Sequence, residues 1–147
     1  MQLCSYNNYY SMTQEEINLV KSTWKMIRQI DASVVGDTFY SKLFYENPSL
    51  RQLFPAQLDE QYKKLVMMLN FLIERLDKLD AIDTEIEELA NRHLRYKVRP
   101  GHYRMVGNAL LWTLQQGLGQ DWSDEVGNAW RKCYGTLMER MLAVKES

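Results

Sequence analysis

The sequence predicts an all-α protein. Its 147 residues include only 7 glycines and 3 prolines, whereas an all-β chain needs turn residues at short, regular intervals. Apolar residues instead recur at intervals of three and four along most of the chain, which is the period of an amphipathic helix. A compact domain of this length also buries enough surface to enclose a flat apolar cofactor.

The first two helices are predicted from their start and stop signals. Thr13 and Glu16 have the spacing of a capping box. The helix that follows carries apolar residues at helical intervals: Ile17, Val20, Trp24 and Ile27. A second helix is expected over about 32–46, ending before Pro48 because the residue that precedes a proline avoids the α region. One side of this helix is apolar: Val35, Phe39, Leu43 and Phe44.

The most regular apolar stripe lies between residues 58 and 76, after a short turn over 49–54. Its members are spaced by four and three in alternation: Leu58, Tyr62, Leu65, Leu69, Leu72 and Leu76. Several charged residues fall largely off this stripe: Lys63, Lys64, Glu74 and Lys78. The pattern predicts a long helix with one apolar face and one solvated face.

Three more helices are expected in the C-terminal half. Thr84 and Glu87 form a second capping-box pattern, beside a face that consists of Ile82, Ile86, Leu89, His93 and Tyr96. Pro100 suits the first turn of the next helix, which residues 117–119 (Gly-Leu-Gly) should end. Its apolar side consists of Tyr103, Val106, Leu110 and Leu114. Ser123 should cap the last helix, whose inward residues are Val126, Trp130, Tyr134, Leu137 and Met141.

The chain should fold as one domain of six or seven helices. Residues 1–11 show no usable period and are expected to form a flexible N-terminal tail. Residues 12–147 form the domain, because no repeat, low-complexity run or interdomain linker interrupts them.

Composition and charge exclude several classes of function. The formal net charge is −1 and the pI is about 6.1, so no overall positive field attracts nucleic acid. No apolar run approaches the ~18 residues of a membrane helix, and the first residues lack the pattern of a secretory signal. Cys4 and Cys133 make no disulfide framework. We therefore expect a cytoplasmic protein that binds neither nucleic acid nor membrane.

His93, Tyr40 and Gln61 are the candidate functional residues. A histidine on the apolar face of a helix is costly to bury unless its ring is paired. The pattern alone favours a hydrogen-bonded core histidine over a metal ligand, and half-buried polar side chains over a ligand site for Tyr40 and Gln61. No HExxH or CxxC spacing and no glycine-rich phosphate loop are present. Cys133 is expected to be a small buried hydrophobe.

Several motifs, taken together, resemble the globin family over residues 13–142. The matching segments are Phe39-Tyr40-Ser41-Lys42-Leu43-Phe44, Asn47-Pro48, Leu53-Phe54, Asn91-Arg92-His93, His102-Tyr103-Arg104-Met105-Val106-Gly107 and Ala129-Trp130-Arg131-Lys132-Cys133-Tyr134-Gly135. They are similar to bacterial single-domain globins of the flavohaemoglobin and Hell's Gate kind, with neuroglobin more distant. The resemblance implies a globin fold of six to eight helices, in a three-over-three arrangement around a haem.

The resemblance also implies a site. His93 corresponds to the proximal histidine that ligates the iron of haem b (iron protoporphyrin IX). Tyr40 and Gln61 correspond to distal residues that contact the bound gas, and Leu65 to an apolar residue that crowds it. The other expected haem contacts are Phe39, Phe54, Leu69, Leu89, Val98 and Tyr103. Cations at the pocket mouth are expected to meet the haem propionates: Lys64, Arg92 and Arg95.

The sequence departs from flavohaemoglobins at three points. Those proteins continue into a flavin and nicotinamide reductase, whereas this chain stops at Ser147. They place a glutamate behind the proximal histidine where this chain has Lys145, unless Glu146 substitutes. The segment between Phe54 and Gln61 is shorter and resembles the Hell's Gate type. We therefore do not expect a peroxidase-like iron.

The expected function is reversible binding of dioxygen, and of CO and NO. Hydroxyl and amide donors from Tyr40 and Gln61 would stabilise the negative charge on bound dioxygen and slow its release, which suits sensing, scavenging or reaction better than bulk oxygen transport. The alternatives are an NO dioxygenase or nitrite reductase that works with a separate reductase, a haem-based gas or redox sensor, and a helical adaptor without haem.

Overall fold

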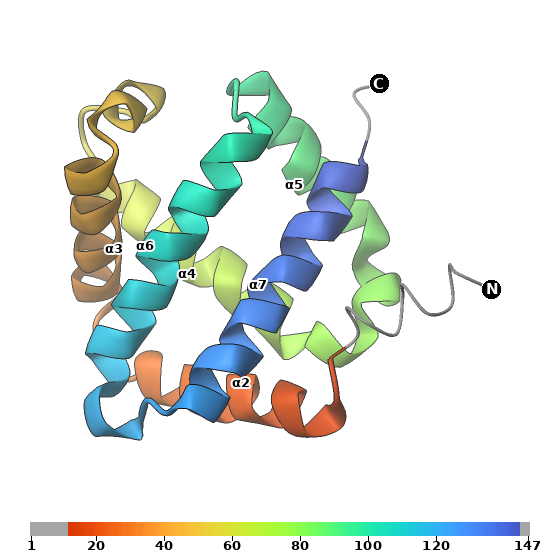
Figure 1. The fold of residues 1–147 in the computed structure, drawn as a ribbon. Helices are drawn as coiled ribbons and strands as arrows, with labels where there is room; N and C mark the ends of the chain where they lie inside the picture. The colour runs from red at the N-terminus through yellow and green to blue at the C-terminus, as the bar shows by residue number, and fades with distance from the viewer. Residues whose placement is uncertain (1–11, 145–147) are drawn as a thin grey trace.

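Six α-helices and three short 3₁₀ helices make up the part of the chain that the computed structural model describes, residues 12–144 (Figure 1). They follow in the order α2 (Gln14–Ile27), α3 (Ala32–Glu46), η1 (Pro48–Leu53), α4 (Asp59–Glu74), η2 (Leu76–Ile82), α5 (Asp83–Arg95), α6 (Pro100–Leu118), η3 (Gly119–Asp121) and α7 (Asp124–Ala143). The range 12–144 contains no strand. The expected all-α class is therefore confirmed. The proposed tail, Lys145 and Glu146 lie outside the described residues.

Local signals set most helix ends as expected. The Thr13 hydroxyl accepts a hydrogen bond from the Glu16 N–H at 3.1 Å, and the Glu16 carboxylate accepts one from the Thr13 N–H at 2.8 Å. The Ser123 hydroxyl accepts the Val126 N–H at 3.2 Å, and Pro100 lies in the first turn of α6. Gly119 follows α6 with a φ of 53°, a conformation that glycine adopts without steric cost.

The predicted start of α5 is wrong. No side chain caps this helix, which begins at Asp83 and places Thr84 inside its first turn. The 3₁₀ helix η2 leads directly into α5, and burial of Ile82 at their junction fixes where the helix starts. Tyr96 also leaves the predicted inward face: it follows the last residue of α5 and is 68% exposed.

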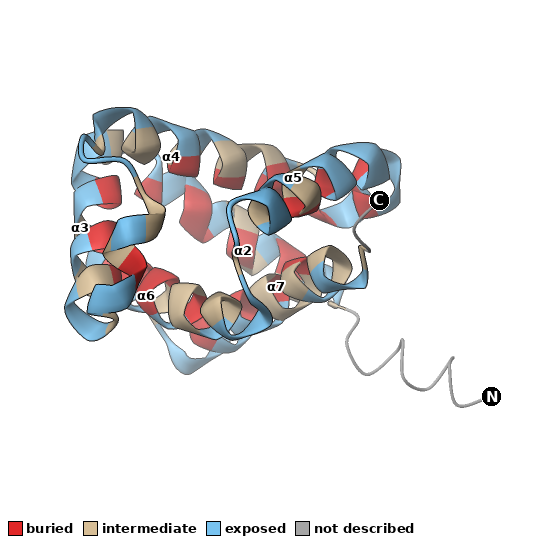
Figure 2. Cartoon of the chain, turned by 90° about the horizontal axis from the view of Figure 1, so that it is seen from above, coloured by how far each residue is buried: buried red, intermediate tan, exposed pale blue. Residues whose placement is uncertain are grey.

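The hydrophobic core joins the first and last helices to α4 through two tryptophans. The rings of Trp24 and Trp130 meet edge to face with centroids 6.2 Å apart. The Trp130 indole N–H donates to the Thr23 hydroxyl at 2.9 Å, and the Trp24 indole N–H donates to the Asn70 side-chain oxygen at 3.1 Å. Cys133 is buried nearby, and burial raises the pKa of its thiol to about 12. Figure 2 shows the buried residues on the inward helix faces.

Some pairs of helices pack closely and others do not, and the site lies beside a pair that does not. α3 packs against α4 and α6, α2 packs against α7, and α5 packs against α7 and η2. Among these described helices, α4 and α5 do not pack closely against each other. No helix within 12–144 has the length and apolar character to cross a membrane.

Gly36 permits the close crossing of α3 and α4. A Cβ atom at Gly36 would lie 2.5 Å from the Cβ of Tyr62, so any larger residue would push α4 away. The Tyr62 hydroxyl donates to the Asp37 carboxylate at 3.2 Å and ties the same crossing at its outer edge. One turn after Gly36, α3 carries Tyr40, and one residue before Tyr62, α4 carries Gln61. The crossing therefore brings these two residues together.

Candidate functional site

Tyr40 lies at the centre of an aromatic cluster. It is 4% exposed, and four rings surround it with centroid distances of 4.8–5.9 Å: Phe39, Phe44, Phe54 and Tyr62. Burial raises the pKa of the Tyr40 phenol, because an apolar environment disfavours the charged form. The hydroxyl therefore keeps its proton at neutral pH and can serve as a hydrogen-bond donor.

Gln61 shares a side-chain hydrogen bond with Tyr40. This bond acts against the burial effect on the Tyr40 pKa, as expected when the amide N–H donates to the phenol oxygen. With the amide as donor, the Tyr40 O–H can itself donate to a third group. Leu65 and Leu69 lie one and two turns further along α4 and are buried. The structure thus places two polar donors beside apolar walls.

Arg51 holds the loop that follows Phe54, and the sequence pattern did not indicate this role. Its guanidinium donates to the backbone oxygens of Phe54, Pro55 and Ala56 at 3.3, 2.9 and 2.9 Å. The same group lies over the Phe44 ring, 5.4 Å from its centroid. Arg51 therefore fixes two of the rings around Tyr40 from the solvent side. No local signal could have revealed it, because an isolated arginine in a short turn is ordinarily solvated.

His93 is half-buried on α5, with its ring fixed by its own helix. Its Nδ1 lies 2.7 Å from the backbone oxygen of Leu89. Since a carbonyl oxygen can only accept, Nδ1 carries the proton and Nε2 presents a lone pair. This arrangement is typical of metal-ligating histidines, whose second nitrogen donates to a carbonyl or carboxylate. The bond therefore orients His93 and leaves Nε2 as the nitrogen that can ligate a metal.

Tyr103 stands beside His93, with ring centroids 6.2 Å apart. Burial raises the pKa of Tyr103, so its hydroxyl stays neutral. The Tyr134 hydroxyl donates to the backbone oxygen of Tyr103, which fixes the first turns of α6 against α7. The sequence places Tyr134 on the inward face of the last helix and in a globin-like motif, but it does not predict this hydrogen bond.

The segment after α5 locks the end of the His93 helix. The Val98 N–H donates to the His93 oxygen at 2.9 Å, and the Lys97 N–H donates to the Leu94 oxygen at 3.0 Å. These two bonds form a Schellman motif, which requires a left-handed residue and usually takes glycine there. Lys97 fills that position with a φ of 65°. Val98 is half-buried directly after it.

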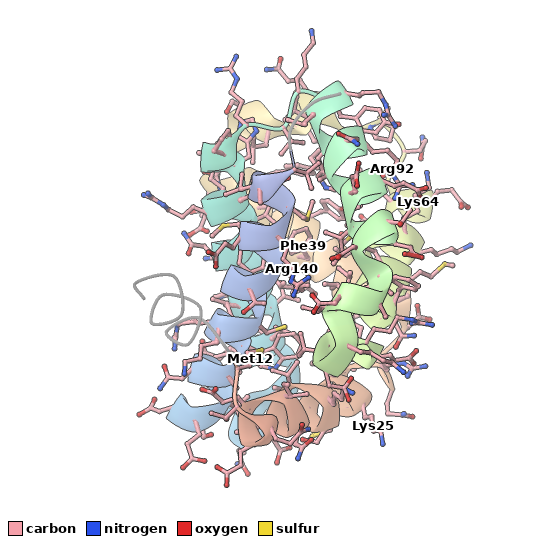
Figure 3. The ribbon with its side chains drawn as sticks, turned by 90° about the vertical axis from the view of Figure 1, so that its right-hand side faces the viewer. Met12, Lys25, Phe39, Lys64, Arg92 and Arg140 are labelled. Atoms are coloured by element: carbon pink, nitrogen blue, oxygen red, sulfur yellow. The ribbon has the colours of Figure 1, made fainter. Side chains whose placement is uncertain are left out.

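A cavity of about 230 Å³ lies between α4 and α5. It is lined by Met68, Phe71 and Leu72 of α4 and by Glu85, Glu88, Leu89 and Arg92 of α5. Leu89 thus belongs both to this cavity and to the hydrogen bond that orients His93. Figure 3 shows Arg92 and Lys64 on the same side of the molecule, while Phe39 lies inside.

These features fit a haem. A flat apolar group needs two helices that are held apart, apolar walls and one nitrogen ligand with a free lone pair. α4 and α5 line the gap with Met68, Phe71, Leu72 and Leu89, beside the carboxylates of Glu85 and Glu88. His93 presents its Nε2 lone pair from α5, but neither His93 nor Tyr40 nor Gln61 lines this cavity. The aromatic cluster around Tyr40 brings donors from α3 and α4. Fold and site together define a helical protein with the features of a haem pocket.

Comparison with known proteins gives the family. The Globin family matches residues 37–141, and the chain belongs to this family. An uncharacterised globin-like protein of Aquifex aeolicus is 27% identical, over 92% of this chain and 95% of that protein. A flavohaemoprotein of Vibrio cholerae is 28% identical, over 87% of this chain but only 33% of its own length. The chain therefore spans about a third of that flavohaemoprotein.

Solved structures agree on the fold. A bacterial globin from Campylobacter jejuni superimposes with a TM-score of 0.79 at 21% identity, covering 90% of this chain and 95% of that one. An engineered carbene transferase, built on a protein of Rhodothermus marinus proposed to be a nitric oxide dioxygenase, gives a TM-score of 0.77 at 24% identity. It covers 88% of this chain and 89% of its own. The globin fold is thus confirmed, and membership of the family implies haem binding.

Proposed function

We propose that this globin binds haem b through His93 and holds dioxygen tightly with Tyr40 and Gln61. One observation carries the proposal: the Nδ1–H of His93 donates to the Leu89 oxygen at 2.7 Å, which leaves Nε2 as a ligand. The bound iron would supply the reversible bond to dioxygen, CO or NO. We also propose a cytoplasmic location, as expected from the sequence.

The chain's own residues would tune this bond. The Tyr40 hydroxyl and the Gln61 amide would donate to the partly negative oxygen of the ligand. A buried hydrogen bond to a charged acceptor contributes about 1.5–3 kcal/mol. Two such bonds would slow the release of dioxygen by roughly a hundredfold or more, since about 1.4 kcal/mol corresponds to tenfold. Leu65 would limit the space for the ligand and exclude water.

The remaining predicted contacts would hold the porphyrin. Leu69, Leu89 and Val98 would form apolar walls, and the rings of Phe54 and Tyr103 would add further apolar contacts. The propionates would meet cations at the rim of the cavity. Arg92 lines that cavity, and Lys64 and Arg95 are exposed on the same two helices.

A second function has support from the relatives. Flavohaemoproteins match this chain over 33% and 31% of their length, and a similar solved structure is based on a protein proposed to be a nitric oxide dioxygenase. The same Tyr40 and Gln61 pair would serve NO dioxygenation or nitrite reduction if a separate reductase supplied electrons. Consumption of NO by the holoprotein with a flavin reductase added in trans distinguishes this activity from simple binding.

The ligand assignment is tested by substituting each histidine. His93→Ala should abolish stable haem binding, because it removes the nitrogen that ligates iron. His102→Ala is the matched control: His102 accepts the Arg99 N–H at 3.0 Å as a helix cap and should not affect the cofactor. Titration with hemin, followed by the Soret band, measures both. A normal Soret band in the His93 variant contradicts the assignment, and a colourless unsubstituted protein contradicts the function as a whole.

A further inference from the structure

The corner between α5 and α6 concentrates positive charge. No aspartate or glutamate lies between Glu88 and Asp121. The corner holds five of the chain's 18 cations and none of its 19 carboxylates: Arg92, Arg95, Lys97, Arg99 and Arg104. The rest of the chain keeps 13 cations against 19 carboxylates. The small net charge therefore conceals a basic corner, as we call these five residues, on an otherwise acidic molecule.

No ion pair within residues 12–144 neutralises the charge of the basic corner. All five side chains are exposed, and none forms an ion pair with another residue in the range 12–144. The first turn of α6 has no acidic residue, although the helix dipole favours negative charge there. Two haem propionates would offset at most two of the five charges. At least three of these exposed cations thus have no ion-pair partner in the described range.

Two exposed apolar side chains lie among these cations. Leu94 is 38% exposed and Tyr96 is 68% exposed, directly beside Arg95. Exposed apolar side chains mixed with cations are the composition of a transient protein interface, and electron-transfer complexes are the small members of that class. The basic corner therefore has the surface of a docking site for a protein.

The basic corner also adjoins the proposed haem ligand. Leu94 follows His93 in the sequence, and the locked turn over Lys97 and Val98 connects α5 to α6. The corner lies at the top of Figure 1 and faces the viewer in Figure 2, where it is largely exposed. A protein bound there would approach the haem from the side of its proximal ligand.

We propose that the basic corner docks an acidic electron-donor protein. The proposal rests on the haem function proposed above. One electron passes from the donor's reduced iron–sulfur cluster to the ferric iron, which becomes ferrous, and no proton or other group is transferred. Positive charge on one surface and negative charge on the other steer the encounter and raise the association rate.

The test measures reduction of the holoprotein by an acidic [2Fe–2S] ferredoxin. Reduced ferredoxin is mixed with ferric holoprotein in CO-saturated buffer, and the Soret shift of the ferrous CO form gives the second-order rate constant. The variant is Arg99→Glu with Arg104→Glu, which leaves Arg92 and Arg95 for the propionates. At an ionic strength of about 10 mM, where screening is weak, this variant should react at least about tenfold more slowly. The difference should largely vanish at about 0.5 M salt.

A matched variant controls for overall charge. Lys25→Glu with Lys78→Glu makes the same change in net charge at two exposed cations that form no ion pair within residues 12–144. Lys25 lies at the opposite end of the molecule from Arg92 (Figure 3). The control should stay within about twofold of the unsubstituted rate, since steering depends on local charge. Equal slowing of both variants, or rates that do not depend on salt, would overturn the proposal.

Two further measurements separate the remaining outcomes. The Soret band of each variant is recorded first, so a chain that takes up no haem refutes the proposed function before docking is tested. If the Glu variant is misfolded by circular dichroism, the milder Arg99→Gln with Arg104→Gln replaces it and should still slow reduction. Amide chemical shifts should then change at 92–104 on addition of ferredoxin. Tighter binding of duplex DNA to the same amides would overturn the choice of partner.

Discussion

Burial determines what the hydroxyl of Tyr40 can do. Four aromatic rings remove this phenol from water, and its raised pKa keeps the proton in place. The hydrogen bond with Gln61 leaves that proton available to a ligand. Tyr62 is similar in ring and position, but its hydroxyl is already committed to Asp37. The two tyrosines therefore differ in function because of the partner of each hydroxyl group.

Tyr40→Phe should speed the release of dioxygen about tenfold or more, since it removes one hydrogen bond to a charged acceptor. Stopped-flow displacement of dioxygen by CO measures the rate. Tyr62→Phe is the matched control, because it removes a hydroxyl from the same stacked pair without removing a donor to the ligand. An unchanged off-rate in the Tyr40 variant would exclude this residue from ligand binding.

Single elements show which signals a sequence can carry. The starts of α2, α6 and α7 depend on residues at or next to the helix end, so Thr13, Pro100 and Ser123 indicated them. The start of α5 depends on η2 and on burial of Ile82, which are set by the rest of the fold. The sequence also did not indicate the turn after α5, because the left-handed position there is filled by Lys97 and not by the usual glycine.

Lys97→Gly should stabilise the protein. A left-handed conformation costs a non-glycine residue about 1–2 kcal/mol, and part of this gain is lost because glycine has more entropy in the unfolded chain. We expect a net gain of about 0.5–1 kcal/mol, or a rise in Tm of about 1–4 °C, measured by thermal unfolding. Lys97→Ala keeps the Cβ atom and should not stabilise; an equal gain in that variant would show that lysine's charge, not its backbone, is the cause.

Across the whole molecule, ion pairs link helices that are distant in sequence. Lys132 of α7 pairs with Glu16 of α2 at 2.9 Å. Arg140 joins the end of α7 to Asp80 and Asp83 at 2.9 and 3.1 Å. The Thr13 backbone N–H is the main cause that lowers the pKa of Glu16, with Lys132 adding to it. A carboxyl group whose pKa is lower in the folded than in the unfolded chain stabilises the fold at pH values above its unfolded pKa. This contribution is lost as the pH falls through the folded pKa.

Glu16→Gln should therefore make stability less dependent on pH between about 5 and 3. The amide oxygen of glutamine can still accept the Thr13 N–H, so the cap is kept while the titrating charge is lost. Urea unfolding at several pH values measures the effect. The control is Glu15→Gln, the neighbouring residue in the first turn, which is exposed. A steeper loss of stability for the Glu16 variant on acidification would contradict the assignment.

The candidate site also contains features that the sequence indicates and features that only the fold reveals. The resemblance of several motifs to globins indicated His93, Tyr40 and Gln61, whereas the residue pattern alone favoured ordinary core roles for them. The sequence could not indicate that Gly36 lets α3 and α4 cross closely enough for Tyr40 and Gln61 to meet, nor that Arg51 secures Phe54. These contacts join segments through the fold, and no periodic pattern within one helix records them.

Helix α5 has few closely packed neighbours, so a bound haem would supply part of the apolar surface against which this helix packs. Among the described elements, α5 packs closely only against α7 and η2, and the cavity between α4 and α5 lies beside Leu89 on its inner side. A porphyrin seated there would complete the hydrophobic centre that the other helices build from side chains. Part of the free energy of haem binding would then offset the entropy cost of ordering α5. Variants that make α5 less ordered should therefore also bind haem less tightly.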